Sequence, residues 1–292
     1  MAVPHNVARD KLVISFSGGR TSAYMTYHLL NSSLIKDFSD VVVVFANTGQ
    51  EHNDTLDFVN CCDLYFGWDV FWLEADIQKD KPGIGYKIVT YETAARWNDS
   101  SRPSPYEELS KKRGVPNVAV PRCSRDLKVE AITSFVVDHL GWRRRQYTTA
   151  IGIRADEPKR FLKEAKYTFP YGEKWHPLVQ LGLIKEDVLD FWEEQPFDLS
   201  IPEHMGNCLW CFKKSDKKLM QVMSELPEAF DFPEKLERLY GKIHPKTTDV
   251  QYNIFRGNRT TQDMRKLFFS TADPTYLSQN PSLCEESCEG FE

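Results

Sequence analysis

The sequence has no apolar run long enough to cross a membrane. Its branched apolar stretch, Val41–Ala46, is far shorter than the roughly 20 residues that a transmembrane helix needs. The first residues, Met1–Lys11, lack the apolar segment of a secretory signal. Internal repeats and low-complexity tracts are missing as well. These absences argue against a membrane protein and a repeat array, and they predict a cytoplasmic protein with no membrane partner.

An excess of charge of one sign is also lacking. The 292 residues include 37 Lys and Arg against 42 Asp and Glu, which gives a net charge of −5. A broad basic groove for nucleic acid is therefore not indicated, although the local run Arg143–Arg145 keeps a nucleic-acid partner open. The hydrophobic fraction of 41% excludes global disorder and allows a sizeable core, in one large or two smaller domains. The sequence leaves open whether the protein forms an oligomer.

Histidine pairs at metal-ligand spacing are absent, but a cysteine pair is present. Cys208 and Cys211 form a C-x-x-C, which can place two thiolates on one metal ion or cluster, and Cys123 lies upstream in a basic segment. The basic neighbours are expected to lower the thiol pKa values. The pattern predicts a metal centre on these three residues. Zinc closed by His204 and metal-free buried thiols are the alternatives, and the pair Cys61–Cys62 is expected to be buried in a helix.

Strand and helix signals alternate along the first half of the chain. The run Val41–Phe45 is apolar on both faces, as is typical of a buried parallel strand. The alternation predicts an α/β fold with a doubly wound parallel sheet, whose ligands bind at the carboxyl ends of the strands. The expected strands are Leu12–Phe16, Val41–Phe45, Asp69–Leu73 and Thr148–Ile153. The expected helices begin near Thr21, cover Thr55–Cys62 and lie between Leu127 and Leu140.

Two regions are expected. Residues 1–180 form the nucleotide-binding α/β domain, with a polar, proline-containing insertion at about 79–121 that we interpret as an excursion from the sheet and a candidate lid. Residues 181–292 form a mostly helical region that carries the C-x-x-C and a loose acidic tail. The helices expected there are Lys185–Glu194, Asp216–Glu225, Pro233–Tyr240 and Thr261–Phe269.

A glycine turn joins the first expected strand to the first helix. It is neither a Walker loop nor G-x-G-x-x-G. Gly18 and Gly19 are expected to adopt backbone angles barred to other residues, so that an anion approaches the main chain and the helix N-terminus. The turn predicts a phosphate site, with a ligand-free tight turn as the alternative. The residues assigned to the site are Ser15, Ser17, Gly18, Gly19, Arg20, Thr21 and Ser22.

A charged cluster follows the last expected strand. Arg154 and Arg160 are suited to a bidentate clamp on phosphate or sulfate. Asp156 or Glu157 can hold Mg²⁺ or a ribose hydroxyl. A solvated loop is the alternative interpretation.

Five segments in order resemble the phosphoadenosine-phosphosulfate reductase family of the PP-loop superfamily. Together they cover roughly residues 11–215, and the whole chain resembles the branch carried by phages and mobile elements. One departure from the family is that Ser124 stands where iron–sulfur relatives have the second cysteine of a pair. The segments are Ser17–Ser22, Phe45–Thr55, Cys123–Lys128, Gly152–Arg160 and His176–Trp192.

The resemblance implies an adenine nucleotide alpha-hydrolase-like fold that binds ATP or a phosphoadenosine-phosphosulfate (PAPS)-like adenine nucleotide. It implies a 4Fe-4S cluster with one open iron on Cys123, Cys208 and Cys211, whose fourth ligand is Cys284, Cys288 or a non-protein species. The adenine is expected near the end of the second strand. The nucleotide-binding residues added are Phe45, Ala46, Asn47, Thr48, Gly49 and Gly152, and the catalytic residues are Lys128, Arg154, Glu157 and Arg160.

Three functions agree with this resemblance. In the first, ATP adenylylates an unidentified acceptor, pyrophosphate leaves, and sulfur from a sulfur donor displaces AMP. In the second, the protein is a sulfonucleotide reductase, in which a cysteine attacks PAPS and a thioredoxin-like protein restores the thiol. In the third, it is a non-catalytic nucleotide-sensing or host-interaction module.

Overall fold

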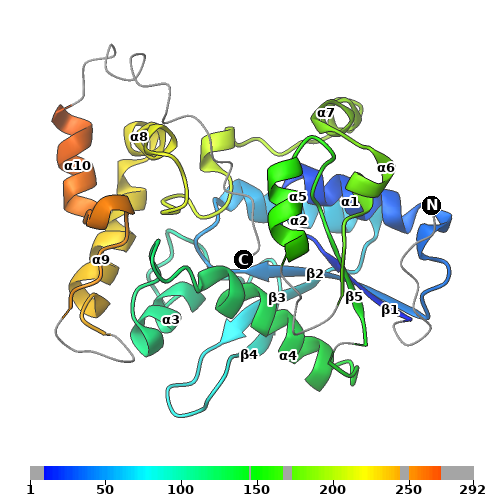
Figure 1. Cartoon of the computed structure of the whole chain (residues 1–292), viewed down its shortest axis with the longest axis horizontal. Helices are drawn as coiled ribbons and strands as arrows, with labels where there is room; N and C mark the ends of the chain where they lie inside the picture. Colours follow the sequence, from blue (N-terminus) through cyan, green and yellow to red (C-terminus); the bar gives the residue numbers. More distant parts are fainter. Residues whose placement is uncertain (1–9, 145, 167–172, 244–249, 271–292) are drawn as a thin grey trace.

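The computed structural model describes residues 10–144, 146–166, 173–243 and 250–270. Its centre is a six-stranded sheet of order β4-β3-β2-β1-β5-β6 (Figure 1). Neighbouring strands are parallel except for β3 and β4, which are antiparallel. The α/β class and the largely parallel sheet are thus confirmed. The strands are β1 (Lys11–Ser15), β2 (Asp40–Asn47), β3 (Phe71–Asp76), β4 (Gly85–Val89), β5 (Thr148–Ile151) and β6 (Glu173–Trp175).

Helices cover both faces of the sheet, as a buried parallel sheet requires. On one face, α1 (Arg20–Leu30) and α2 (Asn53–Phe66) pack on alternate strand residues such as Ile14 and Phe45. On the other face, α4 (Glu130–Asp138) packs Phe135 against Val13 and Val44 of the alternate register. The alternation of strand side chains between the two clusters explains why β1 is apolar at successive positions.

The helix predicted between Leu127 and Leu140 begins with a different geometry. Its first turn, Arg125–Val129, is π-helical and leads directly into α4. The fully buried carboxylate of Asp126 lies in this turn, 2.8 Å from Arg113 Nη1 and 2.9 Å from Arg125 Nε. Single π-turns inside helices are frequent at functional sites, and this one follows Cys123 and contains Lys128.

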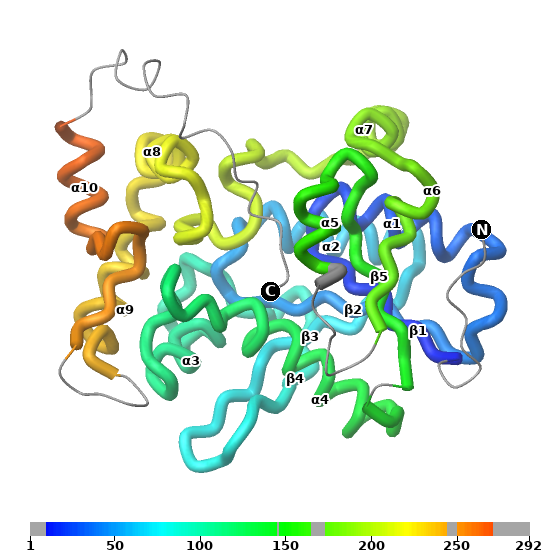
Figure 2. Tube along the Cα trace, in the orientation of Figure 1, coloured from blue at the N-terminus to red at the C-terminus, as the bar shows by residue number. Residues whose placement is uncertain are grey.

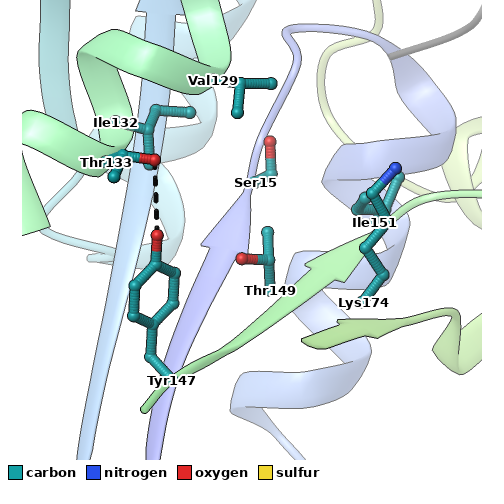
Figure 3. Close-up of a pocket in the computed structure, with 8 residues that line it drawn as sticks. All are labelled: Ser15, Val129, Ile132, Thr133, Tyr147, Thr149, Ile151 and Lys174. Atoms are coloured by element: carbon teal, nitrogen blue, oxygen red, sulfur yellow. Dashed lines mark hydrogen bonds between the residues drawn. The ribbon is translucent and has the colours of Figure 1, made fainter. Parts of the chain in front are cut away.

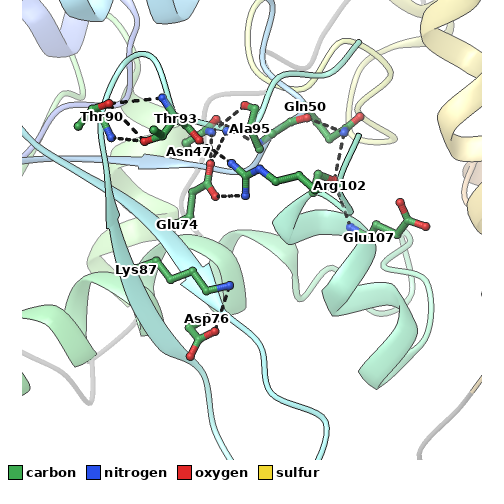
Figure 4. Close-up of polar contacts among 12 residues, drawn as sticks. Asn47, Gln50, Glu74, Asp76, Lys87, Thr90, Thr93, Ala95, Arg102 and Glu107 are labelled. Atoms are coloured by element: carbon green, nitrogen blue, oxygen red, sulfur yellow. Dashed lines mark hydrogen bonds and ion pairs between the residues drawn. The ribbon is translucent and has the colours of Figure 1, made fainter. Parts of the chain in front are cut away.

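The interpretation of residues 79–121 as an excursion from the sheet was wrong. The segment contributes the edge strand β4 and the helix α3 (Pro105–Arg113), which buries Tyr106 and Leu109. Its connecting loop is fastened to the sheet by the buried carboxylate of Glu74 (Figure 4). That carboxylate accepts hydrogen bonds from the Ala95 N–H and from Arg102 Nη1, the second at 3.2 Å. The strand escaped prediction because its edge position leaves Lys87 and Ile88 exposed.

The helices expected in the second region are present within two residues of their predicted bounds. The three that follow the C-x-x-C gather at one end of the molecule beside α3 (Figure 2). No helix among the described residues is both long and apolar enough to cross a membrane. The four expected helices are α7 (Lys185–Glu193), α8 (Asp216–Glu225), α9 (Asp231–Tyr240) and α10 (Thr261–Ser270); two further helices, α5 (Pro158–Lys166) and α6 (Pro177–Leu181), precede them.

Candidate functional site

Three loops meet at the carboxyl edge of the sheet, because β2, β1 and β5 are adjacent. The first is the glycine turn between β1 and α1, the second follows β2, and the third follows β5. A side-chain contact links the first and third loops: Arg154 Nη1 lies 3.1 Å from the Thr21 hydroxyl oxygen, which accepts a hydrogen bond. The structure thus brings together the predicted phosphate turn and the predicted arginine cluster.

The two glycines of the turn have different conformations. Gly18 has a φ of +82°, and a Cβ there would lie 2.8 Å from the Thr55 Cγ2 atom of α2. Gly19 has an ordinary φ of −105°, and no atom of the described residues lies within 4 Å of a Cβ placed on it. The expected unusual backbone angle therefore belongs to Gly18 alone. Gly19 instead borders open space in front of the helix.

The start of α1 is suited to an anion. Gly19 is the N-cap of α1 and has no side chain to cap the helix. The first turn of α1 contains no acidic residue. The first backbone N–H groups of a helix have no intrahelical acceptor and carry partial positive charge. Ser22 Oγ accepts a hydrogen bond from Ser17 N at 3.1 Å and donates one to Gly19 O at 2.9 Å, which fixes the turn. Gly152 packs against this turn, since a Cβ there would lie 3.0 Å from Ser22 Cα.

Arg20 and Ser15 do not direct their side chains at the turn. The Arg20 guanidinium forms a bidentate pair with Asp198, at 2.6 and 2.8 Å, and also donates to Leu199 O. This contact joins α1 to the chain after α7. Any contribution of Arg20 to a phosphate site is therefore through its backbone N–H.

Ser15 lines a small pocket on the α4 side of β1 and β5 (Figure 3). The Tyr147 hydroxyl lies 3.4 Å from the Thr133 hydroxyl in the same pocket. The pocket is small and is lined mainly by apolar atoms.

The carboxylates of the third loop orient its arginines. Glu157 accepts hydrogen bonds from Arg154 N at 2.9 Å and from Arg160 Nη1 at 3.0 Å. Asp156 Oδ1 accepts from Arg154 Nε at 2.9 Å. Both guanidiniums are largely buried. The predicted cluster therefore assembles at the strand end, with its carboxylates engaged by the arginines.

The end of β2, where the adenine is expected, is covered by other parts of the chain. Phe45 and Asn47 are fully buried. The Asn47 side-chain amide donates to Glu74 Oε1 at 2.8 Å and to Ala95 O at 2.9 Å (Figure 4). A Cβ on Gly49, whose φ is +74°, would lie 2.9 Å from Ser104 Cβ. Asn47 and Gly49, together with buried Ala46, therefore form a wall rather than an exposed base-binding surface.

The C-x-x-C turn docks on the residues that follow β2. Glu51 and Cys208 form an antiparallel bridge, and Leu209 N donates to Gln50 O at 3.1 Å. The Trp210 indole N–H donates to Gln50 Oε1 at 2.9 Å. Cys208 Sγ lies 3.6 Å from the Thr48 hydroxyl oxygen. The thiol of Cys208 thus reaches the carboxyl edge of the sheet, although 160 residues separate it from Thr48.

Burial outweighs the basic neighbours in setting the thiol pKa values. Burial, and next to it the nearby Cys211, raises the pKa of Cys123 to about 11, against an opposing effect of Lys213. Burial and then the Glu51 carboxylate raise the pKa of Cys208 well above its ordinary value. The basic neighbours do lower the thiol pKa values, as expected, with Lys213 acting on Cys123 and Lys128 on Cys208, but burial is the larger effect and the net pKa is raised. Both thiols are protonated at neutral pH.

Lys128 is the cation closest to the carboxylate of this centre. Its ammonium lies 3.4 Å from Glu51 Oε1, and Glu51 is buried. Burial alone lowers the pKa of Lys128, but the neighbouring Glu51 carboxylate raises it above its ordinary value. Glu51 Oε2 accepts from the Thr48 hydroxyl at 2.7 Å and from Thr48 N at 3.1 Å. Lys128 is thus a partly buried cation close to Glu51, Cys208 and Cys123.

The three cysteines have the right chemistry for a thiolate-bound metal centre, but the described residues do not complete its coordination. Cys123, Cys208 and Cys211 interact electrostatically with one another and with the buried hydroxyl of Tyr106. Among the described residues, however, no three His, Cys, Asp or Glu side chains are arranged to hold a metal ion. His204 Nε2 lies 3.0 Å from Glu225 Oε2, which commits it elsewhere. Cys284 and Cys288 lie outside the described residues.

No protein-family model matches the chain. The chain is 34% identical over 301 residues to "Uncharacterized nin region protein ORF290" of Escherichia phage lambda, covering 96% of this chain and 94% of the relative. It belongs to the family of this phage protein. Because the match covers nearly the whole chain, it includes both the sheet and the helices that carry the C-x-x-C. The expected relationship to phage proteins is thus confirmed.

Two residues of the site in this phage-family protein were not predicted. Glu51 lies inside the segment Phe45–Thr55, and a carboxylate placed directly after a buried strand is a signal that could have identified it as a site residue. Tyr106 lies in the insertion, where no pattern in the sequence connects it to the cysteines. Cys61 is exposed and Cys62 is buried on α2, so only the second agrees with the predicted buried pair.

Proposed function

We propose that this protein is a PP-loop enzyme that binds ATP or a related adenine nucleotide and couples adenylylation of an acceptor to sulfur chemistry. One observation carries the proposal: the same sheet edge bears the glycine turn with Arg154 and, through Thr48, the thiol of Cys208. A nucleotide phosphate chain and a sulfur atom bound there would be neighbours.

The phosphates would lie in front of Gly19, where the N–H groups at the start of α1 point outward. Arg154 and Arg160 would offset the negative charge that develops at the reacting phosphorus. Glu157 would keep the Arg160 guanidinium in place, and Asp156 the Arg154 guanidinium, without reorganisation during the reaction. Because the carboxylates of Asp156 and Glu157 are engaged by arginine, Mg²⁺ would arrive with the nucleotide phosphates.

The cysteines favour a ligand role over that of a free nucleophile. A thiol with a raised pKa is mostly protonated at neutral pH and is a poor nucleophile, which weighs against direct attack of Cys123 or Cys208 on a sulfonucleotide. A 4Fe-4S cluster, or zinc, bound to the three cysteines would hold them as thiolates and supply an open position for sulfur. Lys128 and Lys213 would balance the added negative charge.

The test is ATP binding by Gly19→Val, measured by calorimetry on anaerobically purified protein. The backbone at Gly19 accepts a side chain, so the variant should fold with an unchanged melting temperature. Valine would fill the phosphate position and abolish binding, and Gly19→Ala should weaken it less. Undiminished ATP affinity in folded Gly19→Val would overturn the phosphate site.

Turnover separates the three functions. Pyrophosphate release from ATP is expected for the adenylylating enzyme. Thiol-dependent sulfite release from PAPS would establish the reductase instead. Tight nucleotide binding with neither product would identify a sensing module.

A further inference from the structure

A segment with neither helix nor strand, residues 90–104, runs from β4 to α3 and crosses the end of β2. A Cβ on Gly49, just after β2, would lie 2.9 Å from Ser104 Cβ and 3.0 Å from Ala95 Cβ of this segment. Asn47, at the end of β2, is fully buried. A base therefore reaches the expected adenine position only when the segment moves. Irregular segments of this length inside a domain are uncommon and are usually functional.

One buried carboxylate fastens the segment to the sheet (Figure 4). Glu74 of β3 accepts hydrogen bonds from the Ala95 N–H and, at 3.2 Å, from Arg102 Nη1. Arg102 Nη2 also donates to Thr93 O at 2.6 Å, so the guanidinium ties two parts of the segment to Glu74. The Asn47 amide completes the network, because it donates to both Glu74 Oε1 and Ala95 O. The Arg102 side chain is 42% exposed, so water competes for this link.

The other contacts of the closed segment are weak. The apolar side chains that it buries are those of Ala94 and Ala95, which are small, and its larger aromatic side chains are partly exposed. Two polar atoms at its contact with α2, Trp97 Nε1 and Asn53 Oδ1, are buried without a hydrogen-bond partner among the described residues. Asn53 lies against the segment, since its amide nitrogen is 3.3 Å from Asn98 Oδ1. Unsatisfied buried atoms cost free energy, which hydration would recover when the segment lifts.

We propose that residues 90–104 form a gate over the adenine position, with Glu74 and Arg102 as its latch. This inference rests on the proposed nucleotide site. The gate is closed in the nucleotide-free chain and opens to admit the base. The fraction of open molecules then limits both the rate of nucleotide association and the apparent affinity. A merely structural segment predicts no link between the latch and nucleotide binding.

The experiment loosens the latch from its exposed side with Arg102→Gln in the full chain, which leaves the buried Glu74 in place. Hydrogen exchange of the Ala95 amide without nucleotide reports opening, and stopped-flow fluorescence reports ATP association. We expect both rates to rise about two- to fivefold, the range that loss of a partly exposed ion pair supports. Lys87→Gln is the matched control, because Lys87 pairs with Asp76 at 3.2 Å and joins β4 to β3 rather than to the segment (Figure 4). It should leave both rates unchanged.

Faster exchange with unchanged ATP association in Arg102→Gln would overturn the gate, while the nucleotide site would stand. Unchanged exchange would overturn the latch and therefore the proposal. Equal effects of the arginine and lysine variants would also overturn it, because the response would then not be specific to the segment. A wild-type protein that binds no ATP would instead refute the proposed function, and the gate with it.

Discussion

Replacing Gly18 by alanine tests how the glycine turn is built. Gly18 has a φ of +82°, and a Cβ there would lie 2.8 Å from Thr55 Cγ2 and 3.1 Å from Phe45 Cε2. The left-handed conformation costs a residue with a Cβ about 1–2 kcal/mol. Overpacking a rigid site costs about 1–3 kcal/mol more. We expect Gly18→Ala to lower the free energy of unfolding by about 2–5 kcal/mol.

Gly19→Ala is the matched control, one position along the same turn. Its φ of −105° is open to alanine, and no described atom would contact the new methyl group. Alanine is a poorer N-cap than glycine by about 0.5–1 kcal/mol, but it also reduces the entropy of the unfolded chain by a comparable amount, about 0.4–1 kcal/mol. The two effects offset each other, so the expected change is below about 0.5 kcal/mol.

Urea unfolding followed by tryptophan fluorescence measures both variants. With a slope of about 2 kcal/mol per molar urea, the Gly18→Ala midpoint should fall by about 1 M or more while that of Gly19→Ala stays within about 0.3 M of wild type. Similar midpoints for the two variants would refute the reasoning, because the turn would then not depend on the conformation and packing of Gly18.

Three further expectations follow from the same geometry. Arg154→Gln should weaken ATP binding roughly 10–100-fold, as expected for loss of a charge-assisted contact. Arg20→Gln should change the ATP affinity less than about threefold, because the Arg20 guanidinium is held by Asp198. Equal effects of the two variants in calorimetry would contradict the assignment of Arg154 to the phosphate site. Asp126→Asn should destabilise the fold by about 2–3 kcal/mol in urea, since it leaves Arg113 and Arg125 beside an uncharged buried group. Burial, helped by Lys174 and Arg160, lowers the pKa of His176 from 6.5 to about 4. As the pH falls from 6.5 to 4, the unfolded chain therefore binds a proton that the folded chain does not, and the free energy of unfolding should decrease. His176→Asn should flatten this pH dependence, and an unchanged slope would exclude His176 as its cause.

The fold could be predicted largely because its signals are local. Apolar runs such as Val41–Phe45 and the stripe through Phe135 report burial directly, and strands separated by helices can form a parallel sheet with few topologies. The edge strand β4 has no such signal, because only part of its surface is buried and Ile88 faces outward. Pairing with β3 is decided by backbone hydrogen bonds, which composition does not report.

The candidate site could be predicted only in part. Arg154, Glu157 and Arg160 were found because their position after a strand places them at the carboxyl edge. The closure of β2 could not be foreseen, since it depends on Glu74 meeting Ala95 and Asn47 through a long loop. The protonated state of the thiols was missed for a similar reason. Sequence neighbours show which charges are near, whereas burial, the larger effect here, is a property of the folded chain.

Thr48 explains why these separate features form one site. Its carbonyl accepts the Tyr106 N–H, its hydroxyl donates to Glu51, and the same hydroxyl contacts the Cys208 sulfur. Glu51 in turn lies beside Lys128 at the π-turn before α4. Thr48, buried just after β2, therefore contacts the insertion and the C-x-x-C turn directly, and it is linked to the π-turn through Glu51. Since β2 pairs directly with β1, the residues that contact Cys208 and the glycine turn follow adjacent strands, as the reaction that we propose between a nucleotide-activated group and a sulfur atom needs.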